Sequence, residues 1–123
     1  MTTPNMILLY VRAPARSVEF YSNLLDKEPV EASPTFSMFQ LNQSTMFGLW
    51  AKHAVQPEIT SSAGSTELGL HVEDRATVEA THASWKSRHI PIAQAPTKMD
   101  FGYTFVGLDP DGHRLRVFCP EMP

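Results

Sequence analysis

The sequence predicts an α+β fold made of two tandem β-α-β-β-β modules, whose curved mixed sheets surround a cavity. An apolar segment followed by a helical segment occurs twice, at residues 6–11 and again about sixty residues later at 68–72. After each copy come short apolar segments separated by turn residues, which is typical of strands. A doubled unit of this length indicates one domain built from two related modules that meet at a cavity.

The first module is expected over residues 5–51. Residues 6–12 form an apolar run, which favours a strand buried on both faces. Pro14 then lies in the first turn of a helix, where its missing N–H is tolerated, and apolar residues recur at helical spacing. Three short strands are expected to follow, at 28–32, 36–41 and 45–51.

A polar segment, residues 52–65, shows no sustained period and is expected to link the modules. The second module is expected over residues 66–120, so that the whole chain, 1–123, forms one domain. Asp109-Pro110-Asp111-Gly112 is a strong turn sequence that predicts a closing hairpin. The expected elements are a strand at 66–72, a helix at 75–88 with Asp74 as its N-cap, a strand after Ile90-Pro91, and strands at 101–108 and 113–119.

Composition excludes several classes of function. The 123 residues carry a net charge of −3 without a basic cluster, which argues against nucleic-acid binding. Cys119 is the single cysteine and cannot form an internal disulfide, which indicates a reducing compartment. The N-terminal apolar run is too short for a signal peptide or a membrane span. We therefore expect a cytoplasmic protein with no nucleic-acid or membrane partner.

Two motifs, in this order and within a repeated pattern, resemble the vicinal oxygen chelate superfamily. The first runs from Leu9-Tyr10-Val11 through Arg16-Ser17-Val18-Glu19-Phe20-Tyr21, and the second is Gly107-Leu108-Asp109-Pro110-Asp111-Gly112-His113-Arg114-Leu115. This superfamily includes glyoxalase I, extradiol dioxygenases and the bleomycin and phenazine resistance proteins. The resemblance implies the glyoxalase/bleomycin resistance fold and a homodimer. It also implies that enzymes of this kind hold a divalent metal with His, Gln or Glu side chains from four strands.

When the metal-binding positions of the superfamily are placed on this sequence, they fall on Met6, Gly48, Glu67 and Arg116. A thioether, a glycine, one carboxylate and a guanidinium do not suit a divalent ion, which prefers several oxygen or imidazole ligands. Shifting the register by one residue does not produce a three-ligand set. The sequence therefore predicts no metal, no cofactor and no catalytic residue. The resemblance places the first and last strands of a module side by side, which predicts a Glu67–Arg116 ion pair on the cavity face.

Strand alternation identifies the walls of the cavity, because residues two apart share a face. One face of each sheet is uniformly apolar and suits packing beneath a helix. The other is aromatic and sparsely polar, which is typical of a site for a flat organic ligand. The alternative for each aromatic residue is an ordinary core position. Ligand-binding residues are predicted to be Tyr10, Met46, Trp50, Glu67, His71, Tyr103, Arg116 and Phe118.

Several side chains keep two interpretations. The cavity-facing side of Phe36, Phe39, Phe101 and Tyr103 stays open at this point. His71 is a candidate acid or base as well as a ligand-orienting group. Cys119 falls on the helix-facing side and is expected to be structural. Trp85 belongs to a helix and is expected to pack inside the protein or at a subunit contact.

These features favour metal-independent binding and sequestration of a small, planar aromatic or antibiotic-like molecule, as in the antibiotic-binding members of the superfamily, giving drug or toxin resistance without turnover. A first alternative is a metal-dependent enzyme of the superfamily, either a glyoxalase-type lyase or isomerase or a dioxygenase. A second is a regulatory or assembly module with a vestigial cavity. Bound metal with turnover distinguishes the enzyme, and ligand-dependent stabilisation without metal distinguishes the binding protein.

Overall fold

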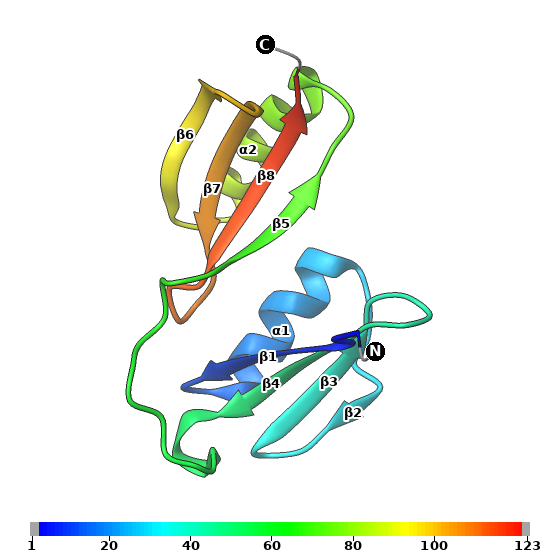
Figure 1. The fold of residues 1–123 in the computed structure, drawn as a ribbon, viewed down its shortest axis with the longest axis vertical. Helices are drawn as coiled ribbons and strands as arrows, with labels where there is room; N and C mark the ends of the chain where they lie inside the picture. The colour runs from blue at the N-terminus through cyan, green and yellow to red at the C-terminus, as the bar shows by residue number, and fades with distance from the viewer. Residues whose placement is uncertain (1–2, 122–123) are drawn as a thin grey trace. The chain divides into compact units, whose positions relative to one another are not determined.

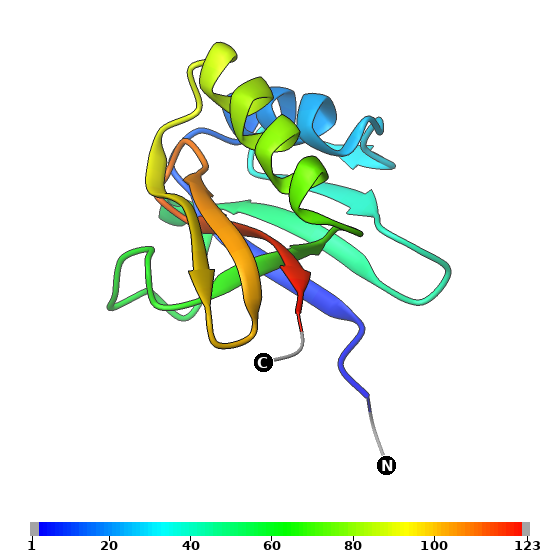
Figure 2. The same ribbon diagram turned by 90° about the horizontal axis from the view of Figure 1, so that it is seen from above.

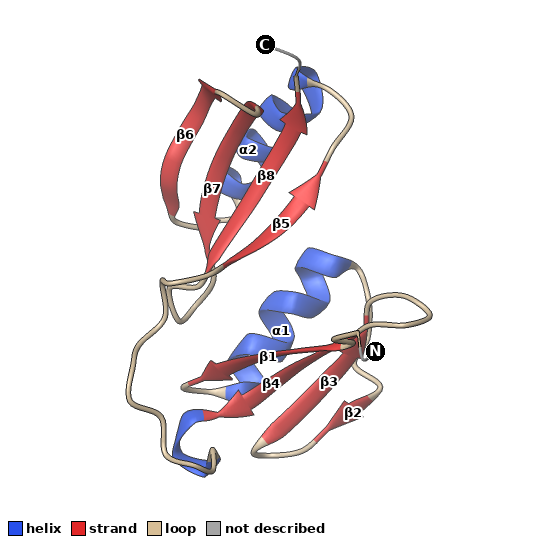
Figure 3. Cartoon of the chain, viewed as in Figure 1, coloured by secondary structure: helices blue, strands red, loops and turns tan. Residues whose placement is uncertain are grey.

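The computed structural model describes residues 3–121 and has the predicted α+β architecture (Figures 1 and 3). The chain divides into two compact units, 1–62 and 63–123, and the boundary lies inside the segment predicted to be a linker. In chain order the elements are β1 (Met6–Val11), α1 (Pro14–Leu25), β2 (Glu31–Ala32), β3 (Phe36–Gln40), β4 (Met46–Ala51), the short 3-10 helix η1 (Lys52–Ala54), β5 (Glu67–His71), α2 (Arg75–Ser87), β6 (Ile92–Met99), β7 (Gly102–Leu108) and β8 (Arg114–Pro120).

The two units share one topology. The first sheet has the strand order β1-β4-β3-β2 and the second has the order β5-β8-β7-β6. In each sheet the first strand of the unit pairs in parallel with the last strand, as expected from the resemblance. The remaining strand pairs are antiparallel.

One strand is much shorter than the sequence predicts. The segment 28–32 was expected to be a strand, but only Glu31–Ala32 pairs regularly with β3. Pro29 has no backbone N–H to donate, so pairing cannot extend through it. A single backbone hydrogen bond, from Val30 N to Met38 O at 2.7 Å, continues the contact beyond β2.

The core of the first unit lies between its sheet and α1. Tyr21 of α1 packs edge-on against Phe47 of β4, with 4.9 Å between ring centroids. Phe39 of β3 is also fully buried and lies 6.3 Å from Phe47. Leu9, Val11 and Leu49 share this face of β1 and β4 and are buried, as their alternation predicts, whereas Ile7 near the start of β1 is 37% exposed.

The core of the second unit lies beneath α2, which crosses one face of its sheet (Figure 2). Asp74 is the predicted N-cap of α2 and accepts a hydrogen bond of 2.8 Å from the backbone N–H of Thr77. Trp85 is only 4% exposed and packs edge-on against Phe105 at 5.1 Å, which makes it a core residue of this unit. Leu115, Val117 and Cys119 of β8 are buried on the same side, so Cys119 has the structural position predicted for it.

The turn that joins β7 to β8 is built around Asp109. One carboxylate oxygen of this residue accepts hydrogen bonds from the backbone N–H groups of Asp111 and His113, both at 2.8 Å. Gly112 has a φ of +89°, a conformation that is costly for residues with a Cβ. The turn thus fixes where β8 begins, and with it the positions of Arg114 and Arg116.

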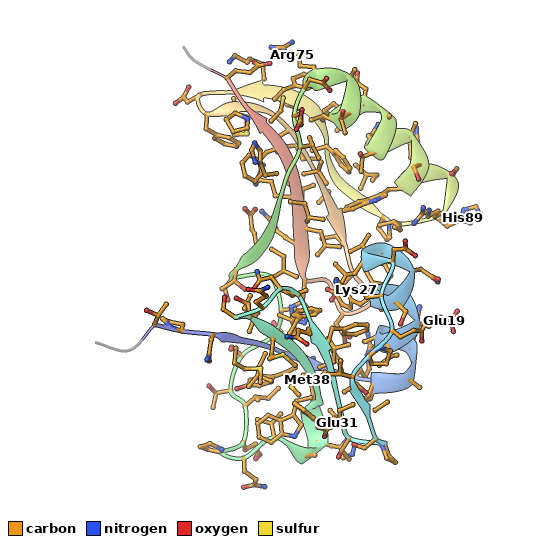
Figure 4. All side chains as sticks on the ribbon, turned by 90° about the vertical axis from the view of Figure 1, so that its right-hand side faces the viewer. Glu19, Lys27, Glu31, Met38, Arg75 and His89 are labelled. Carbon is orange, nitrogen blue, oxygen red and sulfur yellow. The ribbon has the colours of Figure 1, made fainter. Side chains whose placement is uncertain are left out.

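The C-terminal segment of the second unit is attached to both α2 and β6. Glu121 pairs with Arg75 at 2.6 Å and with Lys98 at 3.1 Å. These two cations lower the pKa of Glu121 to about 2, chiefly through its hydrogen bond with Arg75. Figure 4 shows Arg75 at the start of α2. Within residues 3–121, no helix is long and apolar enough to cross a membrane.

Candidate ligand-binding faces

Each sheet has one face that the helix of its own unit does not cover. On β1, Tyr10 is 39% exposed, whereas its neighbours Leu9 and Val11 are buried. On β8, Arg116 and Phe118 are partly exposed and alternate with buried residues. The faces predicted from strand alternation are therefore confirmed in both units.

The open face of the first sheet carries an aromatic cluster. Tyr10 and Trp50 are direct partners across the parallel β1–β4 ladder, and their rings meet edge-to-face at 6.3 Å. Phe36 of β3 lies opposite Trp50 and contacts it edge-on at 6.4 Å. Met46, the fourth apolar residue of this group, is partly exposed on β4. A partly exposed indole flanked by two other rings can accept a flat aromatic molecule.

Gly48 lies between Met46 and Trp50 on this face, and the space above it is already occupied. A Cβ at this position would lie 2.6 Å from Leu8 Cδ2 and 3.2 Å from the ring of Phe36. The absent side chain therefore allows Leu8 and Phe36 to pack over the strand.

The open face of the second sheet contains the predicted ion pair. Arg116 Nε donates to Glu67 Oε1 at 2.8 Å, and Arg116 Nη2 donates to Glu67 Oε2 at 2.9 Å. Arg116 Nη1 also donates to Gln94 Oε1 at 3.1 Å and to Thr104 Oγ1 at 3.2 Å. The Arg116 side chain is 18% exposed and that of Glu67 is 34% exposed, so the pair is only partly hydrated.

Two arginines keep the Glu67 side chain ionised. The hydrogen bonds from Arg116 lower the pKa of Glu67, and the positive charges of Arg116 and Arg114 act in the same direction. Arg114 is farther away, with 4.0 Å between its Nη1 and Glu67 Oε2. Glu67 is thus held as a carboxylate at neutral pH.

Aromatic side chains lie beside the ion pair. His71 and Phe118 are direct partners across the β5–β8 ladder, and their rings are stacked 5.5 Å apart. Phe101 is 44% exposed and meets Phe118 edge-on at 6.4 Å. The guanidinium carbon of Arg116 lies 5.7 Å from the Phe101 ring, within range of a cation–π interaction. A hollow of about 240 Å³ lies on this sheet and is lined by Ala93, Gln94, Val106, Arg114 and Arg116.

The structure corrects one predicted site residue. Tyr103 is paired with Cys119 on β8, and it lies on the side of the sheet that faces α2. Its hydroxyl is 3.4 Å from Glu79 of α2, and the Arg75 guanidinium lies over its ring at 4.4 Å. Tyr103 therefore belongs to the contact between α2 and the sheet, and we leave it out of the candidate site.

The four positions that the resemblance associates with a metal do not fit one. Both carboxylate oxygens of Glu67 already accept hydrogen bonds from Arg116, whose guanidinium would repel a cation. Met6 offers only a thioether and Gly48 has no side chain. Residues 3–121 also contain no group of three or more His, Cys, Asp or Glu side chains arranged to hold an ion.

Sequence reasoning left the faces of Phe36 and Phe101 open, and it missed Gln94 and Thr104 as members of these faces. Phe36 is found by pairing it with Trp50, but this needs the β3–β4 register. Gln94 lies between two irregularities in β6, where the pairing with β7 shifts between Ile92 and Gln94 and again between Gln94 and Thr97. Simple alternation along β6 therefore does not give the face of Gln94.

The strand order of the two units agrees with the result of a comparison with protein families. The family model of the Glyoxalase/Bleomycin resistance protein/Dioxygenase superfamily matches residues 3–117. The chain belongs to this superfamily. The phenazine antibiotic resistance protein EhpR of Enterobacter agglomerans is 32% identical over 121 residues, which cover 96% of this chain and 92% of that protein.

Solved structures of the superfamily fold also resemble this chain. The solution NMR structure of an Agrobacterium tumefaciens protein is 46% identical and has a TM-score of 0.87, with 98% of this chain and 99% of that chain covered. The crystal structure of a glyoxalase-related enzyme from Fulvimarina pelagi is 20% identical and has a TM-score of 0.84, with 97% of this chain and 88% of that chain covered. The latter likeness concerns the fold alone.

Proposed function

We propose that this superfamily member binds and sequesters a planar aromatic compound of the phenazine type, without a metal and without changing the compound, and so contributes to resistance against it. The observation that carries the proposal is that each sheet has an open face with partly exposed aromatic rings, and that the face of the second sheet also holds a largely satisfied ion pair. The resemblance to a phenazine antibiotic resistance protein supports a resistance role and suggests the class of compound. The proposed ligand-binding residues are Tyr10, Met46, Trp50, Glu67, His71, Arg116 and Phe118.

Binding without turnover is supported by the chemistry of the two faces. Glu67 and Arg116 are hydrogen-bonded to each other, so neither side chain is available to act on a ligand as an acid, base or nucleophile. His71, the remaining candidate acid or base, stacks on Phe118 and offers a flat surface. Stacking contributes about 0.5 to 1.5 kcal/mol per aromatic pair beyond buried area, whereas a micromolar complex needs about 8 kcal/mol. Several contacts must therefore act together, which agrees with the extended aromatic faces.

The proposal is tested by binding and recovery of one compound. Purified protein is treated with EDTA, dialysed and titrated with phenazine-1-carboxamide by isothermal titration calorimetry. We expect micromolar or tighter binding that is equal before and after EDTA, and mass spectrometry should recover the compound unaltered after denaturation. Loss of binding that added Zn²⁺, Ni²⁺, Mn²⁺ or Fe²⁺ restores would contradict the metal-independent function. A chemically changed compound would show that the protein is an enzyme.

We also propose that the protein is a homodimer. Edge strand β1 of the first sheet supports this, because its apolar residues Met6, Ile7 and Leu8 are between 37% and 41% exposed. Multi-angle light scattering at micromolar concentration should give twice the 13.8 kDa mass of the chain. Replacing Ile7 by Lys should favour the monomer, while a monomeric wild-type protein would contradict the proposal.

A further inference from the structure

Two arginines line the hollow of the second sheet. They differ in how many of their guanidinium N–H groups already donate hydrogen bonds within the protein. Every nitrogen of the Arg116 guanidinium donates to a protein group: Nε and Nη2 to Glu67, and Nη1 to Gln94 and Thr104. The hydroxyl of Thr104 is itself buried and donates to the carbonyl of Val117 at 2.8 Å. An anionic ligand can take over the paired donors of Arg116 only by displacing Glu67.

Arg114, in contrast to Arg116, is half exposed and makes no hydrogen bond with Glu67. It begins β8 and is paired with Glu67 across the β5–β8 ladder, yet its side chain is 49% exposed. Its nearest distance to the Glu67 carboxylate is 4.0 Å, which is too long for a hydrogen bond. Glu67, Arg114 and Arg116 together carry one more positive than negative charge. Arg114 therefore supplies the accessible positive charge of this hollow.

We propose that Arg114 determines specificity for a planar aromatic acid by pairing with the carboxylate of the ligand. The Glu67–Arg116 pair stays intact and lies beneath the aromatic rings of the ligand. This inference rests on the proposed function. Side chains of β8 on this face follow in the order Arg114, Arg116, Phe118, at intervals of about 7 Å. A carboxylate at Arg114 thus directs the rings toward the Arg116 guanidinium and Phe118, and both groups can stack on aromatic surfaces.

The test compares an acid with its neutral isostere. Phenazine-1-carboxylate and phenazine-1-carboxamide are titrated at pH 7.5 into wild-type protein, Arg114→Gln and the control Arg88→Gln, which removes an exposed arginine at the end of α2. Wild-type protein and Arg88→Gln should prefer the acid by at least about fivefold, since only the carboxylate adds the attraction of two opposite charges to the hydrogen bonds from the guanidinium. Arg114→Gln should bind both compounds with affinities that agree within about twofold. Its affinity for the carboxamide should fall by less than its affinity for the acid.

A second variant separates the roles of the three charges. Glu67→Gln removes the carboxylate that repels the ligand, so it should strengthen acid binding relative to carboxamide binding. Equal wild-type affinity for the two compounds, or an acid preference that survives in Arg114→Gln, would overturn the role of Arg114 and leave the proposed function intact. Failure of both compounds to bind wild-type protein would overturn the proposed function for phenazines and this inference with it.

Discussion

Replacing Trp50 by alanine is expected to weaken binding of phenazine-1-carboxamide by at least about tenfold. The indole is partly exposed at the centre of the first aromatic face, where Tyr10 and Phe36 both meet it edge-on. Its removal takes away stacking of about 0.5 to 1.5 kcal/mol and the apolar area that the ligand would cover at about 25 cal/mol per Å². Together these losses exceed the 1.4 kcal/mol that corresponds to a tenfold change.

The measurement is best made by calorimetry. Trp85 is a second source of tryptophan fluorescence, and it cannot be removed without cost because it packs on Phe105 in the core. Phe20→Ala is a matched control, since it truncates a partly exposed aromatic residue on α1 rather than on the open face. Circular dichroism should show that both variants keep their secondary structure. Wild-type affinity in folded Trp50→Ala would exclude this face from the site.

Much of the fold was predictable because local signals agreed with each other. Pro14 and Asp74 mark the helix starts correctly, and the Asp109 to Gly112 turn determines where the closing hairpin reverses. Alternation in β1, β4, β5 and β8 gives the correct faces because these strands pair without a register shift. The Glu67–Arg116 contact was predicted from that alternation and from the strand adjacency that the resemblance implies, although Glu67 lies directly opposite Arg114 and meets Arg116 on the diagonal.

The sequence was least informative where backbone irregularity or long side chains decide the contacts. The register shifts in β6 could not be located from composition, so the role of Gln94 was not foreseen. Tyr103 was misplaced because an isolated aromatic residue satisfies either face of a strand equally well. Its position depends on the register with Cys119 and on Arg75 of α2, whose guanidinium covers the ring. Such contacts join residues far apart in the sequence and leave no local pattern.

The second large effect is expected from Arg116→Met. This change leaves the Glu67 carboxylate and the amide oxygen of Gln94 without their guanidinium donors, while the methionine keeps much of the apolar stem. Removing one partner of a buried ion pair costs about 3 to 5 kcal/mol, and exposed pairs contribute about 0 to 1 kcal/mol. Because this pair is partly exposed, we expect a loss of about 1 to 3 kcal/mol in the free energy of unfolding, measured by urea denaturation at pH 7.

Two further variants identify the cause of that loss. Glu67→Met combined with Arg116→Met removes both charges, so the double variant should be more stable than Arg116→Met alone. Arg114→Met, which removes the more distant arginine, should change the free energy of unfolding by less than about 0.5 kcal/mol. A double variant less stable than Arg116→Met would contradict this explanation. The stability lost in Arg116→Met would then come from apolar packing and not from the unpaired carboxylate.

Acid titration gives an independent check of the same pair. The pKa of Glu67 is lower in the folded protein than its ordinary value of 4.5, chiefly because of the hydrogen bonds from Arg116. The contribution of the charged carboxylate to stability is therefore complete above about pH 4.5 and is lost as the pH falls through the lower, folded-state pKa. Wild-type protein should be more stable than Glu67→Gln at pH 7, and the difference should shrink as the solution is acidified below pH 4.5. A difference that stays constant down to the acid limit of folding would show that ionisation of Glu67 does not contribute to stability.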